Sequence, residues 1–205
     1  MENYHLKLPI NQIIEGDCLK ILKKFPNESI DMVFTSPPFK EKDVGSDYWE
    51  QYDKWFFEMK RVCKKVLIII HSATKLNELI SRYPPKRLLI WGKGFSQYSY
   101  RFNLILVYQI SDSYKVNKYI WSDCFGIPSI QGKKREHKYQ DPLTLYELLL
   151  KMFKDCNLIL DPFIGSGTTA VACKRLKRNY IGIDISKKYC ELARQRIKNQ
   201  PEPLL

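Results

Sequence analysis

The segment Asn157-Leu-Ile-Leu-Asp161-Pro-Phe-Ile-Gly165-Ser-Gly167-Thr-Thr169 reads as an apolar strand, a glycine-rich turn and the start of a helix. Glycines in such a turn let the backbone approach a ligand closely, and the first N–H groups of the helix can face a negative group. The next expected strand, 179–183, is followed by Asp184, whose carboxylate is placed to bind the hydroxyls of a ribose. The pattern predicts a nucleoside-binding half-site, with a plain glycine-rich strand–helix turn as the alternative.

The spacing of the glycines restricts the ligand. Gly165-Ser-Gly167 lacks the third glycine of dinucleotide-binding turns, and no lysine stands where a phosphate-binding loop needs one. A pyrophosphate site is therefore not expected. A nucleoside with a smaller anionic group, such as the carboxylate of S-adenosylmethionine, fits the pattern better.

Strands and helices alternate over most of the chain, and several of the strands are continuous apolar runs. Strands are expected at 13–17, 29–35, 66–70, 87–91, 102–109, 157–160 and 179–183, and helices at 18–24, 49–64, 74–81, 142–154, 168–176 and 186–198. This alternation predicts an α/β fold with a doubly wound, mostly parallel sheet, and the pair 87–91 and 102–109 predicts an antiparallel edge. The 205 residues are expected to form a single domain, 1–205, in which 110–140 is irregular.

The stretch Phe34-Thr-Ser36-Pro-Pro-Phe39 ends one of these strands with two consecutive prolines. The prolines force the backbone into an extended turn, and because they lack an N–H the nearby carbonyls stay out of ordinary ladder pairing. The strand end then offers a hydroxyl, a free carbonyl and an aromatic face, which suit a planar base with an exocyclic amino group. The alternative is a turn that only ends the strand, with Phe39 in the core.

The charge of the chain is its clearest compositional feature. It has 34 Lys and Arg against 22 Asp and Glu, a formal net charge of +12. This excess favours a polyanionic partner, with a solvated basic surface as the alternative. The six cysteines stand singly, which argues against a zinc site and a disulfide framework. No stretch approaches the length of a membrane span and the start lacks a signal-peptide pattern, so an intracellular location is expected.

Taken together, these motifs resemble those of the DNA amino-methyltransferases, which modify N4 of cytosine or N6 of adenine. Ser36-Pro-Pro-Phe39 matches the catalytic motif (Asp/Asn/Ser)-Pro-Pro-(Tyr/Phe), and residues 161–169 match the cofactor motif Asp-Pro-Phe-x-Gly-x-Gly-Thr-Thr. The catalytic motif comes first, an order similar to that of the β subgroup. The resemblance implies a Rossmann-like S-adenosylmethionine-dependent methyltransferase fold, with S-adenosylmethionine as the cofactor.

The resemblance also implies site residues. Ser36, Pro37, Pro38 and Phe39 would be catalytic: the Ser36 side chain and the Pro37 carbonyl accept the protons of the amine, and Phe39 stacks on the flipped base. No Pro-Cys dipeptide occurs, so no covalent enzyme–base intermediate is expected. The cofactor-binding candidates are Asp17, Asp161, Phe163, Gly165, Ser166, Gly167, Thr168, Thr169 and Asp184.

The serine bears on the substrate. Within the family, Ser-Pro-Pro is mostly associated with cytosine N4, so the resemblance favours N4 methylation of cytosine in double-stranded DNA. N6 methylation of adenine, methylation of an RNA amine and a catalytically silent DNA-binding subunit stay open as alternatives. A nicotinamide-dependent oxidoreductase does not fit the glycine spacing.

DNA contacts are expected from the irregular segment 110–140, because the chain has no room for a separate recognition region. Lys133, Lys134, Arg135 and Lys138 are candidates for phosphate contacts, with a solvated loop as the alternative. Trp91 stands where the family often has a residue beside the base pocket, but it fits core packing equally well. A homodimer and a cognate restriction endonuclease are the further partners that the resemblance suggests.

Overall fold

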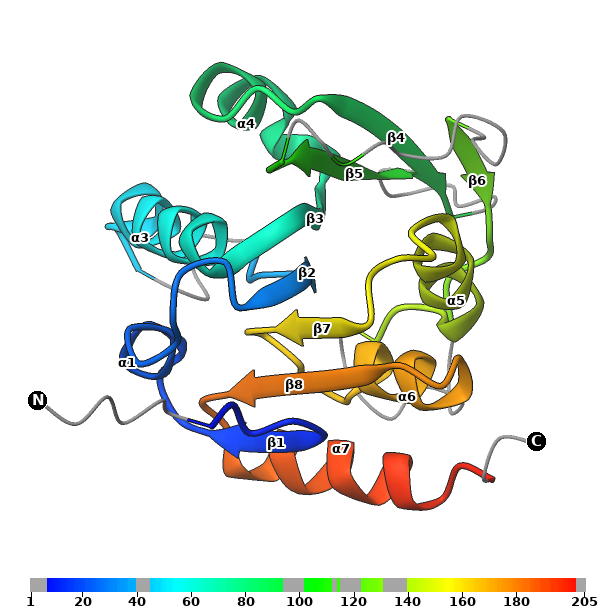
Figure 1. The fold of residues 1–205 in the computed structure, drawn as a ribbon. Helices are drawn as coiled ribbons and strands as arrows, with labels where there is room; N and C mark the ends of the chain where they lie inside the picture. The colour runs from blue at the N-terminus through cyan, green and yellow to red at the C-terminus, as the bar shows by residue number, and fades with distance from the viewer. Residues whose placement is uncertain are drawn as a thin grey trace, which may run out of the picture.

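The computed structural model describes residues 7–39, 45–93, 102–111, 114, 123–130 and 140–201. The described strands form one sheet in the order β1-β8-β7-β2-β3-β5-β4-β6 (Figure 1). The strands are β1 Gln12–Glu15, β2 Ile30–Thr35, β3 Cys63–Ser72, β4 Arg87–Gly92, β5 Phe102–Gln109, β6 Cys124–Gly126, β7 Leu158–Asp161 and β8 Asn179–Asp184. Across the described part of the chain, no helix combines the length and apolar content that crossing a membrane would require.

The sheet is mostly parallel, as the sequence predicts. Strand β5 is antiparallel to both of its neighbours, β3 and β4, whereas every other pairing of described strands is parallel. The predicted antiparallel pair of β4 and β5 is therefore present. It does not form the edge of the sheet, however, because β6 pairs with the outer side of β4.

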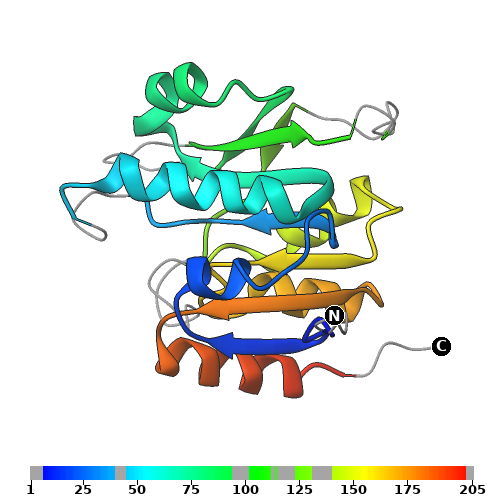
Figure 2. The same ribbon diagram turned by 60° about the vertical axis from the view of Figure 1, so that its left-hand side comes forward.

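Helices cover both faces of the sheet, which makes it doubly wound (Figure 2). The helices α1 Cys18–Leu22, α3 Tyr48–Val62 and α4 Leu76–Arg82 pack on one face, and α5 Leu143–Met152, α6 Thr168–Arg175 and α7 Lys187–Lys198 on the other. Successive side chains of a strand point to opposite faces. In β3, Val66, Ile68 and Ile70 accordingly join the core under α5 and α6, and Leu67 and Ile69 join the core under α3.

Two local expectations are wrong. The segment 110–140 was expected to be irregular, yet Cys124–Gly126 forms β6 by pairing with Ile90–Gly92. Three residues are too few to show a periodic pattern, so only the partner strand reveals this one. Ser186, expected as the first residue of the last helix, is instead the N-cap residue before α7, and its side chain makes no capping hydrogen bond.

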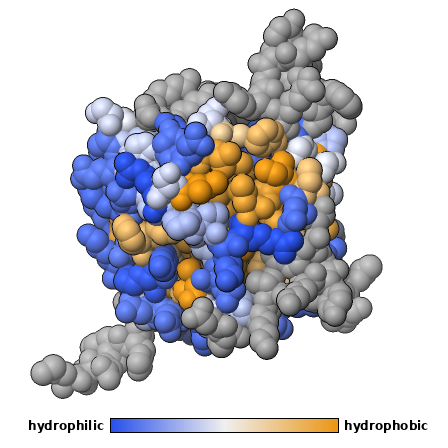
Figure 3. All heavy atoms as spheres, turned by 90° about the horizontal axis from the view of Figure 1, so that it is seen from above, coloured by the Kyte–Doolittle hydropathy of each residue, from blue (hydrophilic) through white to orange (hydrophobic). Residues whose placement is uncertain are grey.

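Apolar side chains also gather on the outer surface near α4 and β4, on the face of Figure 3. Ile80 of α4 is 39% exposed, and Leu88 and Ile90 of β4 are partly exposed. These three residues are absent from the lining of the main pocket, which lies at the carboxyl ends of β2, β7 and β8. The described structure thus separates this apolar surface from the pocket.

Candidate active site

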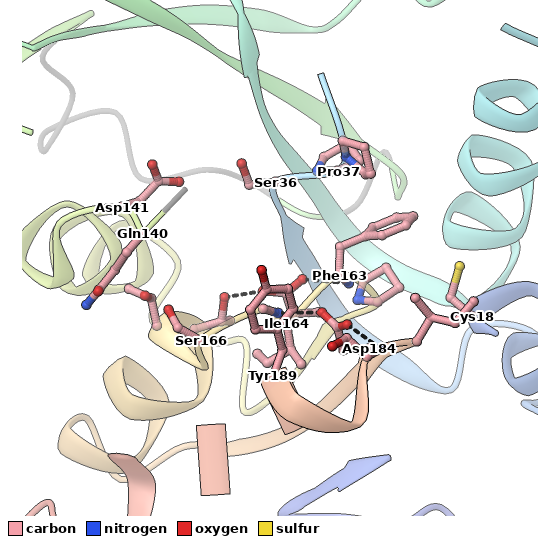
Figure 4. Close-up of a pocket in the computed structure, with 18 of the residues that line it drawn as sticks. Cys18, Ser36, Pro37, Gln140, Asp141, Phe163, Ile164, Ser166, Asp184 and Tyr189 are labelled. Atoms are coloured by element: carbon pink, nitrogen blue, oxygen red, sulfur yellow. Dashed lines mark hydrogen bonds between the residues drawn. The ribbon is translucent and has the colours of Figure 1, made fainter. Parts of the chain in front are cut away.

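A pocket of about 490 Å³ opens at the carboxyl ends of the parallel strands, where ligands of open α/β sheets usually bind (Figure 4). Ser36–Phe39 enter it from the end of β2, and the glycine-rich turn enters it from the end of β7. These two strands are neighbours in the sheet, with Val33 paired to Leu160. Two motifs more than a hundred residues apart in the chain therefore meet at one site.

The pocket contains almost every predicted site residue that the structure describes. Ser36, Pro37, Pro38, Phe39, Asp17, Asp161, Phe163, Gly165, Ser166, Thr168, Thr169 and Asp184 line it. Gly167 does not, because it packs behind the turn: a Cβ added there would lie 2.8 Å from the Cβ of Ala193. Its φ of +85° is also strained for any residue with a side chain.

The charge of the pocket differs from that of the whole chain. Four carboxyl groups line it, from Asp17, Asp141, Asp161 and Asp184, and no lysine or arginine is among its described lining residues. An acidic pocket in a basic protein favours a positively charged small ligand inside and a polyanion outside. It disfavours a phosphate-rich ligand in the pocket, in line with the glycine spacing.

Asp161 connects the two motifs. Its carboxyl accepts hydrogen bonds from the Thr35 hydroxyl at 2.6 Å, from the backbone N–H of Phe163 at 3.1 Å and from the Thr169 hydroxyl. The residue is only 3% exposed, and burial raises the pKa of its carboxyl to about 6 despite these three donors. Thr35, one residue before the proline turn Ser36–Phe39, is thereby held against the start of α6.

Asp184 holds the turn from the other side. One carboxylate oxygen accepts the N–H of Gly165 at 2.9 Å and the other accepts the N–H of Ser186 at 2.8 Å. Because each carboxylate oxygen has two lone pairs, both can still accept a hydrogen bond from a ligand in the pocket. Arg196 of α7 supports the same turn by donating to the carbonyl of Ser166 at 2.6 Å.

Two buried side chains, those of Tyr48 and His71, pack against the proline turn and stabilise it. The Tyr48 hydroxyl donates to the carbonyl of Pro38 at 3.0 Å and lies 2.8 Å from Nε2 of His71. Burial lowers the pKa of His71 to about 4, so its ring is neutral at ordinary pH. The ring of Phe39 lies 4.9 Å from that of His71, and Phe39 is half-buried and faces the pocket.

Three polar side chains, those of Ser36, Asp141 and Tyr146, lie on the wall of the pocket beside the proline turn. Tyr146 of α5 donates a hydrogen bond to the Asp141 carboxyl at 3.0 Å. The nearby Ser36 hydroxyl acts to lower the pKa of both the Asp141 carboxyl and the Tyr146 hydroxyl, although burial raises both. Figure 4 shows Ser36 and Asp141 facing one another at one end of the pocket, away from Asp184 and Tyr189.

Sequence reasoning did not single out some of the lining residues. Asp141, Tyr146 and Trp55 belong to no local sequence motif. Trp91 is 1% exposed, and its ring N–H donates to the carbonyl of Ile127 at 2.7 Å, so it is a core residue. The predicted DNA contacts Lys133, Lys134, Arg135 and Lys138 lie outside the described residues.

Comparison with known proteins places the chain in a family. Residues 87–195, just over half of the chain, match the N4/N6 methyltransferase family described as DNA methylase. The chain belongs to the DNA methylase family. The match contains the complete glycine-rich turn and Asp184, and the proline turn precedes it in the chain. The family depends on S-adenosylmethionine as its methyl donor.

Two curated DNA methylases are similar over most of the chain. The type II methyltransferase M.HinfI of Haemophilus influenzae is 28% identical over 95% of this chain and 70% of its own length. M.BamHI of Bacillus amyloliquefaciens is 26% identical over 93% of this chain. This chain spans only 58% of the length of M.BamHI.

Two solved structures share the fold. The PvuII cytosine-N4-specific DNA methyltransferase superposes with a TM-score of 0.76 at 18% identity, over 92% of this chain and 87% of that one. The complex of M1.HpyAVI with S-adenosylmethionine superposes with a TM-score of 0.72 at 24% identity, over 92% of this chain and 99% of that one. At such low identity the likeness concerns the fold alone, and it agrees with the predicted methyltransferase-like sheet.

Proposed function

We propose that this DNA methylase transfers a methyl group from S-adenosylmethionine to N4 of a cytosine in double-stranded DNA. The observation that carries the proposal is the convergence of the Ser36–Phe39 turn and the turn after β7 on one acidic pocket. One turn suits an aminated base and the other suits a nucleoside. A methyl donor and its acceptor would thus share one cavity.

The residues of the pocket fit S-adenosylmethionine. Its sulfonium and ammonium groups are cationic and match a lining with four carboxyl groups. The Asp184 carboxylate would bind the ribose hydroxyls, and Asp17 with Phe163 would lie toward the adenine. No side chain caps the start of α6 at Gly167, so the first N–H groups of that helix are suited to the cofactor carboxylate.

Other residues predicted to bind the cofactor contribute by shaping the glycine-rich turn after β7. Asp161 accepts hydrogen bonds from Thr35, Phe163 and Thr169, so its effect on the cofactor is to hold the turn in shape. Gly165, Ser166 and Thr168 line the pocket, and Gly167 lets the turn pack on α7.

The chemistry requires an exocyclic amine to act as a nucleophile although its lone pair is delocalised into the ring. When bound, S-adenosylmethionine supplies an electrophilic methyl group, and the C–S bond electrons pass to sulfur as the C–N bond forms. The Ser36 side chain and the Pro37 carbonyl would accept the amine protons and direct the lone pair toward that methyl group. Pro38 keeps the turn extended, and Phe39 would stack on the flipped base.

The choice of cytosine rests on Ser36. Its uncharged hydroxyl stands at the position where N6-adenine enzymes of the resembled family mostly have an aspartate, which favours cytosine N4. Adenine N6 is the second candidate, because the family that the chain matches includes both N6 and N4 methyltransferases.

The proposal extends to partners and organisation. The protein acts inside the cell as one domain, the positive charge of the chain attracts DNA, and Lys133, Lys134, Arg135 and Lys138 contact phosphates. The segment 110–140 contributes to sequence recognition, and a second copy of the chain extends the DNA-binding surface. A cognate restriction endonuclease accompanies the enzyme.

The test is the identity of the methylated nucleoside. Purified protein is incubated with labelled S-adenosylmethionine and either unmethylated double-stranded DNA or RNA, and the digested nucleosides are separated by mass spectrometry. N4-methylcytosine from DNA is the expected product. N6-methyladenine would refute the cytosine assignment, and label on RNA alone would refute the DNA substrate.

A further inference from the structure

A serine hydroxyl can accept a hydrogen bond from an amine only when its own hydrogen points elsewhere. The group has one hydrogen and two lone pairs, so the hydrogen needs an acceptor that does not compete with the amine. In bulk water any solvent molecule can serve as this acceptor. Within a pocket filled by cofactor and base, the acceptor must come from the protein.

The described structure supplies such an acceptor beside Ser36. The Asp141 carboxyl faces Ser36 at one end of the pocket and accepts a hydrogen bond from the Tyr146 hydroxyl at 3.0 Å (Figure 4). Because Tyr146 donates its only hydrogen to Asp141, it is a fixed partner in this cluster. Tyr146 is only 3% exposed, and its ring stacks on that of Phe34 with 4.5 Å between the ring centres. Phe34 lies two residues before Ser36 in the chain.

We propose that Asp141 positions the Ser36 hydroxyl and receives, through it, the proton that the target amine loses during methyl transfer. The proposal rests on the methyltransferase function proposed above and names a residue that the catalytic motif does not contain. Asp141 is a positioning residue for the base, because it acts through Ser36.

The proton and electron balance is as follows. Once the amine nitrogen has bonded to the methyl carbon it carries one proton too many, and an N–H bond breaks with its electron pair left on nitrogen. The proton passes to the Ser36 oxygen, while the hydrogen of that hydroxyl passes to a carboxylate oxygen of Asp141. The products are a neutral methylated amine, an unchanged serine and a protonated Asp141, which later returns its proton to water.

The surroundings of Asp141 suit this role. Four groups influence the Asp141 carboxyl from different elements of the fold: Tyr146 from helix α5, Ser36 after β2, Lys93 after β4 and Asp161 from β7. Burial raises its pKa to about 6 and Asp161 adds to this, whereas Tyr146, Lys93 and Ser36 act in the opposite direction. A carboxyl with this pKa is ionised at neutral pH and is still basic enough to take a proton.

The test measures single-turnover methyl transfer to DNA at saturating cofactor, from about pH 4.5 to 8.5, in wild type, Asp141→Asn, Ser36→Ala and the double variant. We expect the wild-type rate to rise about tenfold per pH unit below pH 6 and then level off. Asp141→Asn is expected to lose this rise and to be about 100-fold slower at pH 8. The double variant is expected to be no slower than Ser36→Ala alone, because both act in one path.

A second readout does not depend on activity. Titration of carboxyl ¹³C signals in the cofactor-free protein should show two groups with pKa values near 6, Asp141 and Asp161, of which one disappears in Asp141→Asn. Tyr146→Phe removes a hydrogen bond that lowers the Asp141 pKa, so it should move the midpoint of the pH–rate curve to higher pH. This variant replaces Asp141→Asn in the test if Asp141→Asn does not fold. Asp155→Asn, an exposed aspartate, is the matched control and should leave the rate unchanged.

The outcomes separate this proposal from the proposed function. Transfer by wild type with an unchanged pH profile in Asp141→Asn, or additive effects in the double variant, would overturn the role of Asp141 alone. Weakened cofactor binding in Asp141→Asn that accounts for the whole loss of rate would do the same. No transfer by wild type to any nucleic acid would overturn both.

Discussion

Asp161 and Asp141 line the same pocket, and burial raises the pKa of both to about 6, yet their partners differ. Asp161 accepts three donors from two strand ends and a helix start, namely Thr35, Phe163 and Thr169. Asp141 accepts a hydrogen bond from Tyr146 and faces Ser36 across one end of the same pocket.

This difference in partners distinguishes two roles for a carboxyl group with a raised pKa. Three of the four lone pairs on the Asp161 carboxylate accept hydrogen bonds from the protein, so its protonation or removal mainly changes the structure of the turn. In the proposed role of Asp141, a change in its protonation alters the orientation of the Ser36 hydroxyl and thereby its interaction with the target amine. A similar pKa therefore does not imply a similar role, and the hydrogen-bond partners decide between the two.

The largest expected effect is that of Asp161→Ala. It leaves two hydroxyls and one N–H without their buried acceptor, so the free energy of unfolding should fall by about 3–5 kcal/mol, measured by urea denaturation. Binding of S-adenosylmethionine, measured by calorimetry, should weaken at least about 100-fold because the turn loses its shape.

The distinction between a structural Asp161 and a functional Asp141 would be wrong if Asp141→Ala destabilised the protein as much as Asp161→Ala does. Asp141→Ala is expected to cost about 1 kcal/mol, because it removes one hydrogen bond from a wall of the pocket that is open to solvent. Equal losses would mean that both acids are structural.

The pH dependence of stability tests the state of Asp161. Its pKa is raised from 3.8 in the unfolded chain to about 6 in the fold, so the folded state binds the proton more tightly. Its contribution to stability is full below about pH 4 and is lost as the pH rises through 6. The unfolding free energy of wild type minus that of Asp161→Asn should thus fall by about 2–3 kcal/mol from pH 4 to pH 7.

This difference cancels the titration of groups that both proteins share, His71 among them. Urea denaturation at five or six pH values would measure it. A difference that stays level or rises with pH would contradict a raised pKa for Asp161.

The smallest effect is expected beneath the proline turn. Tyr48→Phe removes the hydroxyl that donates to Pro38 and contacts His71, so the free energy of unfolding should fall by about 1–2 kcal/mol. The rate of transfer should fall a few-fold, because the turn is less firmly held. Tyr52→Phe is the matched control, since the buried Tyr52 hydroxyl has no hydrogen-bond partner among the described residues.

Tyr52→Phe should leave stability unchanged or slightly raised, and both proteins can be compared by thermal unfolding and single-turnover assays. A loss in Tyr52→Phe equal to that in Tyr48→Phe would show that ring packing, and not the hydrogen bond to Pro38, accounts for the effect.

Local patterns were enough to predict most elements. The strand 102–109 was predicted to the residue, and the ends of the others differ by a few residues. Continuous apolar runs and helical periods are properties of neighbouring residues, so they can be recognised without the fold. The missed strand β6 has no such property, because its three residues become a strand only through their pairing with β4.

The predicted site followed the same division. The proline turn and the glycine-rich turn are contiguous motifs, so the sequence by itself determined their residues and their order and predicted their chemistry. Asp141, Tyr146, Tyr48 and His71 stand alone in the sequence, and no local signal distinguishes them from core or surface residues. Their roles depend on which strand ends and helices are neighbours.

The sequence alone therefore determined the fold class, the family resemblance and the two turns that line the pocket, because each depends on short-range patterns. Only the tertiary structure decided that β2 lies beside β7, which places Thr35 on Asp161 and brings the two turns to one pocket. Only it could distinguish Asp161 from Asp141, since hydrogen bonding and burial come from residues distant in the chain. The physical reason is that a carboxyl group takes its role from the groups packed around it.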